Sequence, residues 1–403
     1  MGKVFVVGTM DTKAEELRYA ADCVRRAGAD AVLVDVGTKG EAADADVTAA
    51  EVAARHPDGA GAVLGLDDRG RAVAGMAEAL ARWLSARDDI GAVLGLGGSG
   101  NTALVTRAMR ALPVGVPKLM VSTVASGDVA PYVGPSDVAM MYSVVDVAGL
   151  NAISRRVIAN AAHAAAGMAL RDPPPAPAGE KPGVGMTMFG VTTALVTRVR
   201  EALEAEYEPY VFHATGAGGR SMEKLADSGL LAALLDLTTT EVPDHLVGGV
   251  FPCDGDRFGA AIRTRLPYVG SVGAVDMVNW GARETVPARF SGRNLYVHNP
   301  NVTLMRTTPE ENRAIAGFIA ERVNRMEGPV RFLLPLRGVS AIAVPGMPFH
   351  DPEADAALFD TLRAQVRPGP DRRLVEVDAA INDPAFADAV LAAFREVAPG
   401  AAR

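Results

Sequence analysis

A glycine-rich segment between an apolar run and a helical pattern carries the strongest chemical signal in the sequence. Its residues are Gly97, Gly98, Ser99, Gly100, Asn101 and Thr102. Glycines let the backbone approach an anion because no Cβ atom stands in the way. The free N–H groups at the start of a helix, together with the helix dipole, can then hold a phosphate. We therefore expect a nucleotide phosphate here, with Ser99 and Thr102 as hydroxyl donors; a tight turn without a ligand is the alternative.

The same segment also matches the pattern GxGxxG over residues 95–100. A dinucleotide site needs an acidic residue about 20 positions later, which binds the ribose hydroxyls. No Asp or Glu occurs between Asp89 and Asp128, and the pattern follows an internal strand rather than the first one. An NAD-dependent dehydrogenase is therefore disfavoured. The pattern GxxxxGK(S/T) of another phosphate-binding loop does not occur in the chain.

Two further segments follow predicted strands of the first half and complete the expected nucleotide site. They contribute Thr9, Asp11, Thr12 and Lys13, and then Ser126, Gly127 and Asp128. Thr12 and Glu15 have the spacing of a capping box, which is a structural explanation for both. Lys13 in a first helical turn opposes the helix dipole unless an anion is nearby. Asp128 could orient a ribose or hold Mg²⁺ with the phosphate oxygens, although a plain turn explains it equally well.

Polar segments in the second half of the chain are candidates for a substrate site. The candidate residues are His213, Gly218, Gly219, Arg220, Glu241, Asp276, Asn279 and His298. Arginine suits bidentate contact with a carboxylate or phosphate, and the acids and histidines could act in acid–base chemistry. Each of them could equally be a cap or turn residue. Thr308 and Glu311 illustrate that simpler interpretation, because they form a capping-box pattern with Pro309 at the first helical position.

Short apolar runs that alternate with helical patterns must position these segments. The predicted strands cover residues 3–7, 31–36, 62–66, 92–96, 118–122, 183–188, 210–213, 232–237, 268–271, 295–298 and 330–334. The predicted helices cover residues 12–27, 148–170, 193–206, 221–229, 309–327, 352–366 and 384–397. Continuous apolar strands between helices indicate parallel sheets that are covered on both faces. We therefore expect an α/β protein with two Rossmann-like, doubly wound domains and mainly parallel sheets.

A proline-rich stretch marks the expected domain boundary. Five prolines lie within residues 172–182, which favours an extended linker. The predicted domains cover residues 1–172 and 183–403, joined by a linker over residues 173–182. Such sheets bind ligands beyond the carboxyl ends of their strands. We therefore expect the nucleotide on the first domain and a small metabolite at the cleft between the domains.

Charge and composition restrict the partners and the compartment. The net charge of −8 argues against generic nucleic-acid binding, which needs a basic face. The two cysteines and six histidines show no spacing of a disulfide framework or a metal site. No targeting signal or membrane span is recognisable. We therefore expect a cytoplasmic protein without a metal site, a nucleic-acid partner or a membrane partner.

Several strings taken together resemble one family. They are residues 8–13 (GTMDTK), 97–100 (GGSG), 145–160, 212–220 (FHATGAGGR), 237–242 (LTTTEV), 276–279 (DMVN), 296–300 (YVHNP), 345–349 (PGMPF) and 381–384 (INDP). Over nearly its whole length, the chain resembles the family formed by the ATP-binding region of the tomato mosaic virus (tobamovirus) resistance protein and its uncharacterised bacterial relatives. The resemblance implies two Rossmann-like domains, ATP binding and homodimers. Asn101 and Ala380 depart from the family pattern, which has glycine and histidine there.

Two functions follow from these predictions. The first is an ATP-binding protein that acts on a small metabolite or senses it. The second is a nucleotide-dependent binding or regulatory protein without chemistry, because no nucleophile–base pair is recognisable. The expected ligands are ATP, with Mg²⁺ as its companion cation, and a small metabolite. Whether the chain is an enzyme is left open by the sequence.

Overall fold

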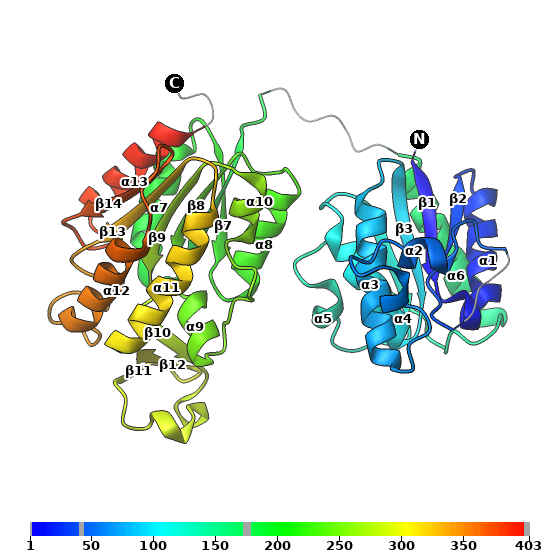
Figure 1. The fold of residues 1–403 in the computed structure, drawn as a ribbon, viewed down its shortest axis with the longest axis horizontal. Coiled ribbons are helices and arrows are strands. Elements are labelled where there is room, and N and C mark those ends of the chain that lie inside the picture. The colour runs from blue at the N-terminus through cyan, green and yellow to red at the C-terminus, as the bar shows by residue number, and fades with distance from the viewer. Residues whose placement is uncertain (1, 40–43, 172–178, 399–403) are drawn as a thin grey trace. The chain divides into compact units, whose positions relative to one another are not determined.

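The computed structural model of the chain describes residues 2–39, 44–171 and 179–398. The chain divides into two compact units, Met1–Ala176 and Pro177–Arg403 (Figure 1). The linker predicted for residues 173–182 lies mostly outside the described residues. Each unit has its own large sheet and its own core, so the two are described separately.

The first unit is built on a five-stranded parallel sheet with the strand order β2-β1-β3-β4-β5. Its strands are β1 (Lys3–Gly8), β2 (Ala31–Asp35), β3 (Ile90–Gly97), β4 (Lys118–Ser122) and β5 (Ala139–Tyr142). Its helices are α1 (Met10–Arg26), α2 (Ala49–Ala53), α3 (Arg69–Ser85), α4 (Ser99–Ala111), α5 (Ala130–Val133) and α6 (Ala152–Ala169). Leu17 of α1 and Ile158 of α6 pack in one core cluster, whereas Leu80 of α3 and Leu104 of α4 pack in another. The apolar strands are thus covered by helices on both faces.

The strand predicted over residues 62–66 is wrong. The chain forms a short 3-10 helix at Ala60–Ala62 and then a turn, and only Val63 in this stretch is buried. Gly65 has a φ of 77°, which interrupts an extended backbone. The apolar run is therefore too short for a strand, and Val63 instead packs in the same core cluster as α3.

Two helices of the first unit begin at positions other than those predicted. α1 begins at Met10, with Thr9 at its N-cap, so the capping box predicted for Thr12 and Glu15 does not form. α6 begins later than predicted, because the side chain of Asn151 accepts hydrogen bonds from the first N–H groups of the helix. The start of α6 thus depends on a capping side chain that the apolar pattern alone does not determine, whereas Thr9 makes no side-chain capping hydrogen bond at the start of α1.

The second unit contains a six-stranded parallel sheet with the order β14-β13-β9-β8-β6-β7. Its strands are β6 (Gly183–Met188), β7 (Glu208–His213), β8 (Ala233–Thr238), β9 (Tyr268–Gly273), β13 (Val330–Pro335) and β14 (Arg372–Val377). Its helices are α7 (Thr193–Leu203), α8 (Ala217–Asp227), α9 (Glu241–Val247), α10 (Gly259–Thr264), α11 (Pro309–Arg325), α12 (Pro352–Gln365) and α13 (Pro384–Val397). α7 and α13 share one core cluster, and α8, α10, α11 and α12 share another. The capping box predicted for Thr308 and Glu311 at the start of α11 is confirmed.

A smaller antiparallel sheet is inserted in the second unit between β9 and α11. It has the order β10-β12-β11 and consists of β10 (Met277–Trp280), β11 (Leu295–Asn299) and β12 (Val302–Arg306). The polar segment predicted around Asp276 and Asn279 is therefore not a loop, because most of it is the buried strand β10. Asp276 and Asn279 suggested a loop, but both are buried and bonded to distant partners.

The first strand of each large sheet lies between the second and the third. β1 pairs with β2 and β3, and β6 pairs with β7 and β8. In the first sheet the chain therefore runs from β1 to β2 on one side and then crosses to β3 on the other side. The resulting topological switch point lies between β1 and β3, and folds of this kind bind ligands there. The predicted fold class is confirmed: both units are Rossmann-like α/β structures with mainly parallel sheets.

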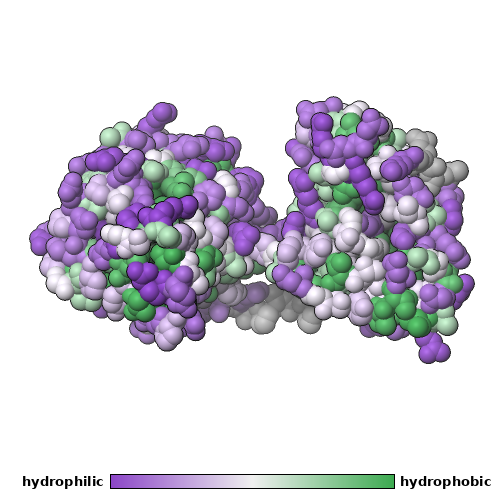
Figure 2. Space-filling view, turned by 90° about the horizontal axis from the view of Figure 1, so that it is seen from below, coloured by the Kyte–Doolittle hydropathy of each residue, from purple (hydrophilic) through white to green (hydrophobic). Residues whose placement is uncertain are grey.

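The surface of both units is mixed in polarity. On the face drawn in Figure 2, hydrophilic side chains surround smaller hydrophobic patches. None of the helices within the described residues is long and apolar enough to cross a membrane. Cys23 and Cys253 are both buried and have free thiols.

Candidate functional site

The loops after β1, β2 and β3 converge on a pocket at the switch point of the first sheet. The pocket has a volume of about 160 Å³. Its lining residues are Thr9, Asp11, Thr12, Val36, Thr38, Lys39, Arg69, Val73, Gly100, Asn101 and Leu104. The structure thus brings together two segments that the sequence places in the nucleotide site, the β1–α1 loop and the start of α4. It adds the loop after β2 and the start of α3, which the sequence analysis did not include.

The glycine segment forms the turn from β3 into α4, and its glycines have separate roles. Gly97 has a φ of 153°, and a Cβ atom there would lie 2.8 Å from Asn101 Cβ. Gly98 is the N-cap residue of α4, and no side chain of the described residues caps this helix. A Cβ atom on Gly98 would meet Thr123 Oγ1 first, at 3.7 Å. The space beyond the first N–H groups of α4 is therefore open, as an anion site requires.

Two cations line this pocket without a carboxylate partner. They are Arg69, which follows the α3 cap Asp68, and Lys39 in the loop after β2. Within the described ranges, neither Arg69 nor Lys39 forms an ion pair. The Arg69 guanidinium lies near the start of α4, because a Cβ atom on Gly100 would be 3.9 Å from Arg69 Nη2. An unpaired guanidinium beside an uncapped helix start makes the pocket favourable for a phosphate.

Two aspartates flank the same loops. Asp35 Oδ1 accepts hydrogen bonds from Met10 N at 2.9 Å and from Gly37 N at 2.8 Å, which ties the loops after β1 and β2 together. Asp35 Oδ2 is buried, without a partner among the described residues. A Cβ atom on Gly37 would lie 3.1 Å from both Asp11 Cγ and Asp35 Oδ1, so the two carboxylates are neighbours. Sequence reasoning missed Asp35, although its place as the last residue of β2, beside the switch point, was a usable signal.

Lys13 and the segment after β4 do not belong to the pocket lining. Lys13 Nζ donates a hydrogen bond to Val147 O in the segment before α6. Residues 126–128 are exposed, and Asp128 Oδ1 accepts a hydrogen bond from Ala130 N at 3.0 Å. The contact of Lys13 with a backbone carbonyl explains this lysine without a phosphate.

The side chains at the start of α4 differ in their availability to a ligand. Asn101 is buried, and its Nδ2 donates to Leu96 O, which fixes the turn. Thr102 is also buried, and its Oγ1 lies 2.6 Å from Ser122 Oγ, so this hydroxyl joins α4 to β4. Ser99 is exposed. Of the two hydroxyls predicted to bind phosphate, only that of Ser99 is free to do so.

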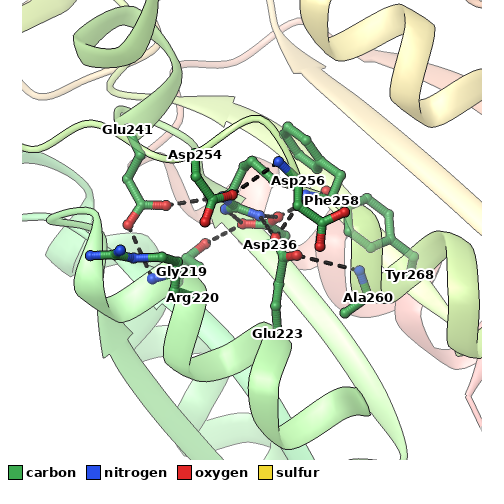
Figure 3. Close-up of polar contacts among 12 residues, drawn as sticks. Gly219, Arg220, Glu223, Asp236, Glu241, Asp254, Asp256, Phe258, Ala260 and Tyr268 are labelled. Atoms are coloured by element: carbon green, nitrogen blue, oxygen red, sulfur yellow. Dashed lines mark hydrogen bonds and ion pairs between the residues drawn. The ribbon is translucent and has the colours of Figure 1, made fainter. Parts of the chain in front are cut away.

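The glycine loop of the second unit binds a carboxylate of the protein itself. Between β7 and α8, Gly216 N and Gly219 N donate to Glu241 Oε1 at 2.7 and 3.0 Å (Figure 3). A Cβ atom on Gly219 would lie 2.1 Å from Glu241 Oε2, so only glycine fits there. Arg220 Nε donates back to Gly216 O at 2.9 Å. The start of α8 is thus occupied by an anion, whereas the start of α4 is open.

Glu241 belongs to a buried cluster of three carboxylates around Arg257. The guanidinium donates two hydrogen bonds of 2.7 Å to Asp236 and single bonds of 2.9 Å to Glu223 and Glu241. The Tyr268 hydroxyl donates to Asp236 Oδ2 at 3.1 Å (Figure 3). Burial raises the pKa of Glu223 to about 7, although the Arg257 charge acts in the opposite direction. The cluster joins α8, β8, α9 and the segment before α10, and removal of one member would leave buried charges unpaired.

Asp276 and Asn279 are buried in two further polar networks. Asp276 Oδ2 accepts a hydrogen bond from Ser340 Oγ at 2.8 Å. Asn279 N donates to Asp244 Oδ1 at 2.7 Å. Burial raises the pKa of Asp276 to about 6 and that of Asp244 to about 7. Both predicted substrate residues therefore contact other parts of the second unit rather than solvent.

The two candidate histidines lie on the surface. His213 ends β7 and stacks on Phe189, with the ring centroids 5.2 Å apart. His298 is exposed on β11 of the small sheet. The predicted substrate residues thus fall into one loop beside Glu241, two buried networks and one separate surface position, and they do not form a single group of accessible side chains.

Comparison with known proteins gives consistent matches along the whole chain. Two family models match, described as the N-terminal and C-terminal domains of an uncharacterised protein family (UPF0261), over residues 2–174 and 181–398. A UPF0261 protein of Rhizobium meliloti (strain 1021) is 58% identical over 99% of this chain and 100% of its own length. One of Clostridium tetani (strain Massachusetts / E88) is 46% identical over 96% of this chain and 97% of its own length. The ToMV resistance protein Tm-1(GCR237) of Solanum lycopersicum is 42% identical over 98% of this chain and 56% of its own length.

Proposed function

The chain belongs to the UPF0261 family, and we propose that it binds ATP through the phosphates, in the pocket between β1 and β3. The observation that carries this proposal is the open start of α4 at Gly98, which no described side chain caps. Arg69 and Lys39 add two cations to the same pocket. Free N–H groups at a helix start bind anions, and the resemblance of residues 8–13 and 97–100 to an ATP-binding region favours ATP among the nucleotides.

The size of the pocket indicates which part of the nucleotide it holds. Its volume of about 160 Å³ is below the range of roughly 300–1,000 Å³ for pockets that enclose a whole small molecule. The proposal therefore places the phosphate chain in the pocket and the adenosine at its rim. Asp11 is assigned to the ribose hydroxyls or to a Mg²⁺ ion that accompanies the phosphates, because carboxylates are the usual protein ligands of Mg²⁺.

Calorimetric titration of the full chain with ATP, with and without Mg²⁺, tests the proposal. Gly98→Val should weaken ATP binding about tenfold or more, because a side chain then fills the space before the N–H groups. The nearest atom to a Cβ atom on Gly98 is 3.7 Å away, so the variant should fold. Gly167→Val is the matched control, since Gly167 is exposed on α6 with no atom within 4 Å of an added Cβ atom.

Each part of the proposal would be contradicted by a different experimental result. If the wild-type chain does not bind ATP, the proposed function is wrong. If folded Gly98→Val binds ATP as tightly as the wild type, the phosphates are not at the start of α4. If NADH displaces ATP and binds more tightly, the dinucleotide interpretation replaces the ATP one.

Two versions of this function differ in whether bound ATP is consumed. In one, ATP is used on a small metabolite, and phosphate release rises when that metabolite is added. In the other, ATP is bound without turnover and regulates binding of a partner. A phosphate-release assay with a panel of metabolites distinguishes the two.

We also propose that the chain works as a homodimer in the cytoplasm, where nucleoside triphosphates are abundant. Its two buried cysteines are free thiols, as expected in a reducing compartment. The dimer rests on the family resemblance, and light scattering of the purified chain tests it. A monomeric mass at micromolar concentration would contradict the dimer without affecting the nucleotide site.

A further inference from the structure

A second pocket lies on the second unit, at the carboxyl end of β13. Its volume is about 420 Å³, within the range of pockets that enclose a small organic molecule. Its walls are the segment over residues 336–351, which follows β13, and residues of α12 from its first turn to its last; Figure 1 shows where β13 and α12 lie. The carboxyl edge of a parallel sheet is where folds of this kind bind ligands. The substrate residues predicted from the sequence do not line this pocket.

The segment over residues 336–351 contains no helix or strand, yet buried polar contacts hold it in place. Arg306 Nε donates to Phe349 O at 2.8 Å, and Arg306 Nη2 donates to Asp355 Oδ1 at 2.6 Å in the first turn of α12. Ser340 Oγ donates to the buried Asp276 at 2.8 Å. Connections of this length without regular structure are uncommon in compact domains and are usually functional when ordered. Arg306 and Asp276 are therefore positioning residues for one wall of the pocket.

Apolar side chains form most of the pocket lining, and a few polar side chains complete it. The polar residues are Arg337, His350, Asp355 and Arg363. Leu336 and Phe359 are among the apolar ones. The negative charge of Asp355 is compensated by its ion pair with the buried Arg306. An apolar pocket with a few polar groups is typical of a site that orients a small molecule.

Two arginines give the rim of the pocket its charge. Arg337 pairs with Asp378 at 2.6 Å, and Arg363 pairs with Glu376 at 2.8 Å and with Asp360 at 2.7 Å; these side chains are between 38% and 72% exposed. Exposed ion pairs of this kind are worth little, so each guanidinium can turn toward a ligand at small cost. The partner carboxylates Asp378, Glu376 and Asp360 do not line the pocket. Apart from Asp355, the charged residues of the lining are therefore arginines, which favour an anionic group.

We propose that this pocket binds a small organic molecule with one carboxylate and an apolar body. The carboxylate contacts Arg337 and Arg363 at the rim, in the bidentate geometry that guanidinium groups allow. The apolar body packs against Leu336 and Phe359. The site is separate from the pocket on the first unit and does not depend on nucleotide binding.

Ligand-observed NMR and calorimetry on the full chain test the proposal with defined probes. The probes are benzoate, phenylacetate and hexanoate, each compared with its uncharged amide. At least one acid should bind about tenfold more tightly than its amide, which is the effect of one charge-assisted contact. The double variant Arg337→Gln/Arg363→Gln should lose the same factor for the acid and leave the weak binding of the amide unchanged.

Ala356→Trp is the variant that fills the pocket. Ala356 lines the pocket and is exposed on α12, so a larger side chain there does not disturb the core. Ala364→Trp is the matched control, because Ala364 is exposed on the same helix and lies outside this lining. Probe binding should be lost in Ala356→Trp and kept in Ala364→Trp, with both variants unfolding at the wild-type temperature.

Three results would overturn the proposal. The first is no saturable binding of any acid to the wild-type chain at millimolar concentration. The second is equal affinity for an acid and its amide, which would remove the role of the arginines. The third is probe binding that survives in Ala356→Trp, which would place the probe elsewhere.

Discussion

Glu223 links the structure to a measurable pH dependence. Its carboxyl group accepts hydrogen bonds from Arg257 at 2.9 Å and from Phe258 N at 2.7 Å inside the second unit. Burial raises its pKa from 4.5 to about 7, although the Arg257 charge acts in the opposite direction. The folded chain therefore binds this proton more tightly than the unfolded chain does. The resulting stabilisation is complete below about pH 4.5 and is lost as the pH rises through about 7.

The size of the effect follows from the two pKa values. The separation between 4.5 and about 7 corresponds to about 3 kcal/mol of unfolding free energy. Glu223→Gln removes this titration but keeps the size of the side chain. Between about pH 5 and pH 8, the unfolding free energy of Glu223→Gln should therefore fall less than that of the wild type. The two falls should differ by up to about 3 kcal/mol. Asp244 and Asp276, whose pKa values burial raises to about 7 and about 6, titrate in the same direction in both proteins.

Urea unfolding at a series of pH values, followed by tryptophan fluorescence, measures this difference. Trp83 lies on α3 of the first unit and Trp280 on β10 of the second. In a Trp83→Phe background, the fluorescence of Trp280 therefore reports the unit that contains Glu223. Parallel pH profiles for Glu223→Gln and its parent would refute the reasoning, because they would show that Glu223 is ionised in the folded chain.

The nucleotide pocket and the second glycine loop can be tested by single substitutions. Arg69→Ala should lower ATP affinity about tenfold in calorimetry, because it removes an unpaired guanidinium from the pocket, whereas Arg71→Ala, outside the lining, should not. Lys13→Ala should leave ATP affinity near the wild-type value, because its amine is bonded to a backbone carbonyl; a loss for ATP but not for adenosine would contradict this. Gly219→Ala should destabilise the second unit by about 1–3 kcal/mol in urea unfolding, because its Cβ atom would lie 2.1 Å from a buried carboxylate oxygen. Gly190→Ala, with no atom within 4 Å of the added Cβ atom, should unfold like the wild type.

The sequence was sufficient to predict most strands of both large sheets, but the edge strands β5 and β14 were not predicted. Strands such as β1 and β8 are buried on both faces, so they appear as continuous apolar runs whatever their neighbours are. The prediction failed where a tertiary contact decides the local structure. Residues 62–66 are apolar but turn at Gly65. The strand β10 was missed because Asp276 precedes it and Asn279 lies within it, and both have partners distant in sequence.

The candidate site was only partly predictable for a similar reason. The glycine segment and the β1–α1 loop have local signals, namely small residues directly after an apolar run. Lys39 and Arg69 have none, because they reach the pocket only through the strand order β2-β1-β3 and the path of α3. Lys13 shows the opposite case: its position in the first turn of α1 suggested an anion, whereas in the structure its amine donates to Val147 O.

Two glycine loops that look alike in the sequence have different environments in the fold. Both lead from a parallel strand into a helix, α4 after residues 97–98 and α8 after residue 216. At α8 the protein supplies its own acceptor, Glu241, which Arg257 holds in place. At α4 no described side chain takes that position, and the pocket beside it is lined by two cations, Arg69 and Lys39, and by one carboxylate, Asp11.

The N–H groups at a helix start need an acceptor, which is a protein group, water or a ligand. In the second unit the N–H groups at the start of α8 are therefore bonded to Glu241. In the first unit no described side chain caps the N–H groups at the start of α4. An open helix start that faces Arg69 and Lys39 is the arrangement expected where the acceptor is an exchangeable phosphate. This comparison supports nucleotide binding at α4 more strongly than the glycine pattern alone, because that pattern occurs at both helices and only the surroundings differ.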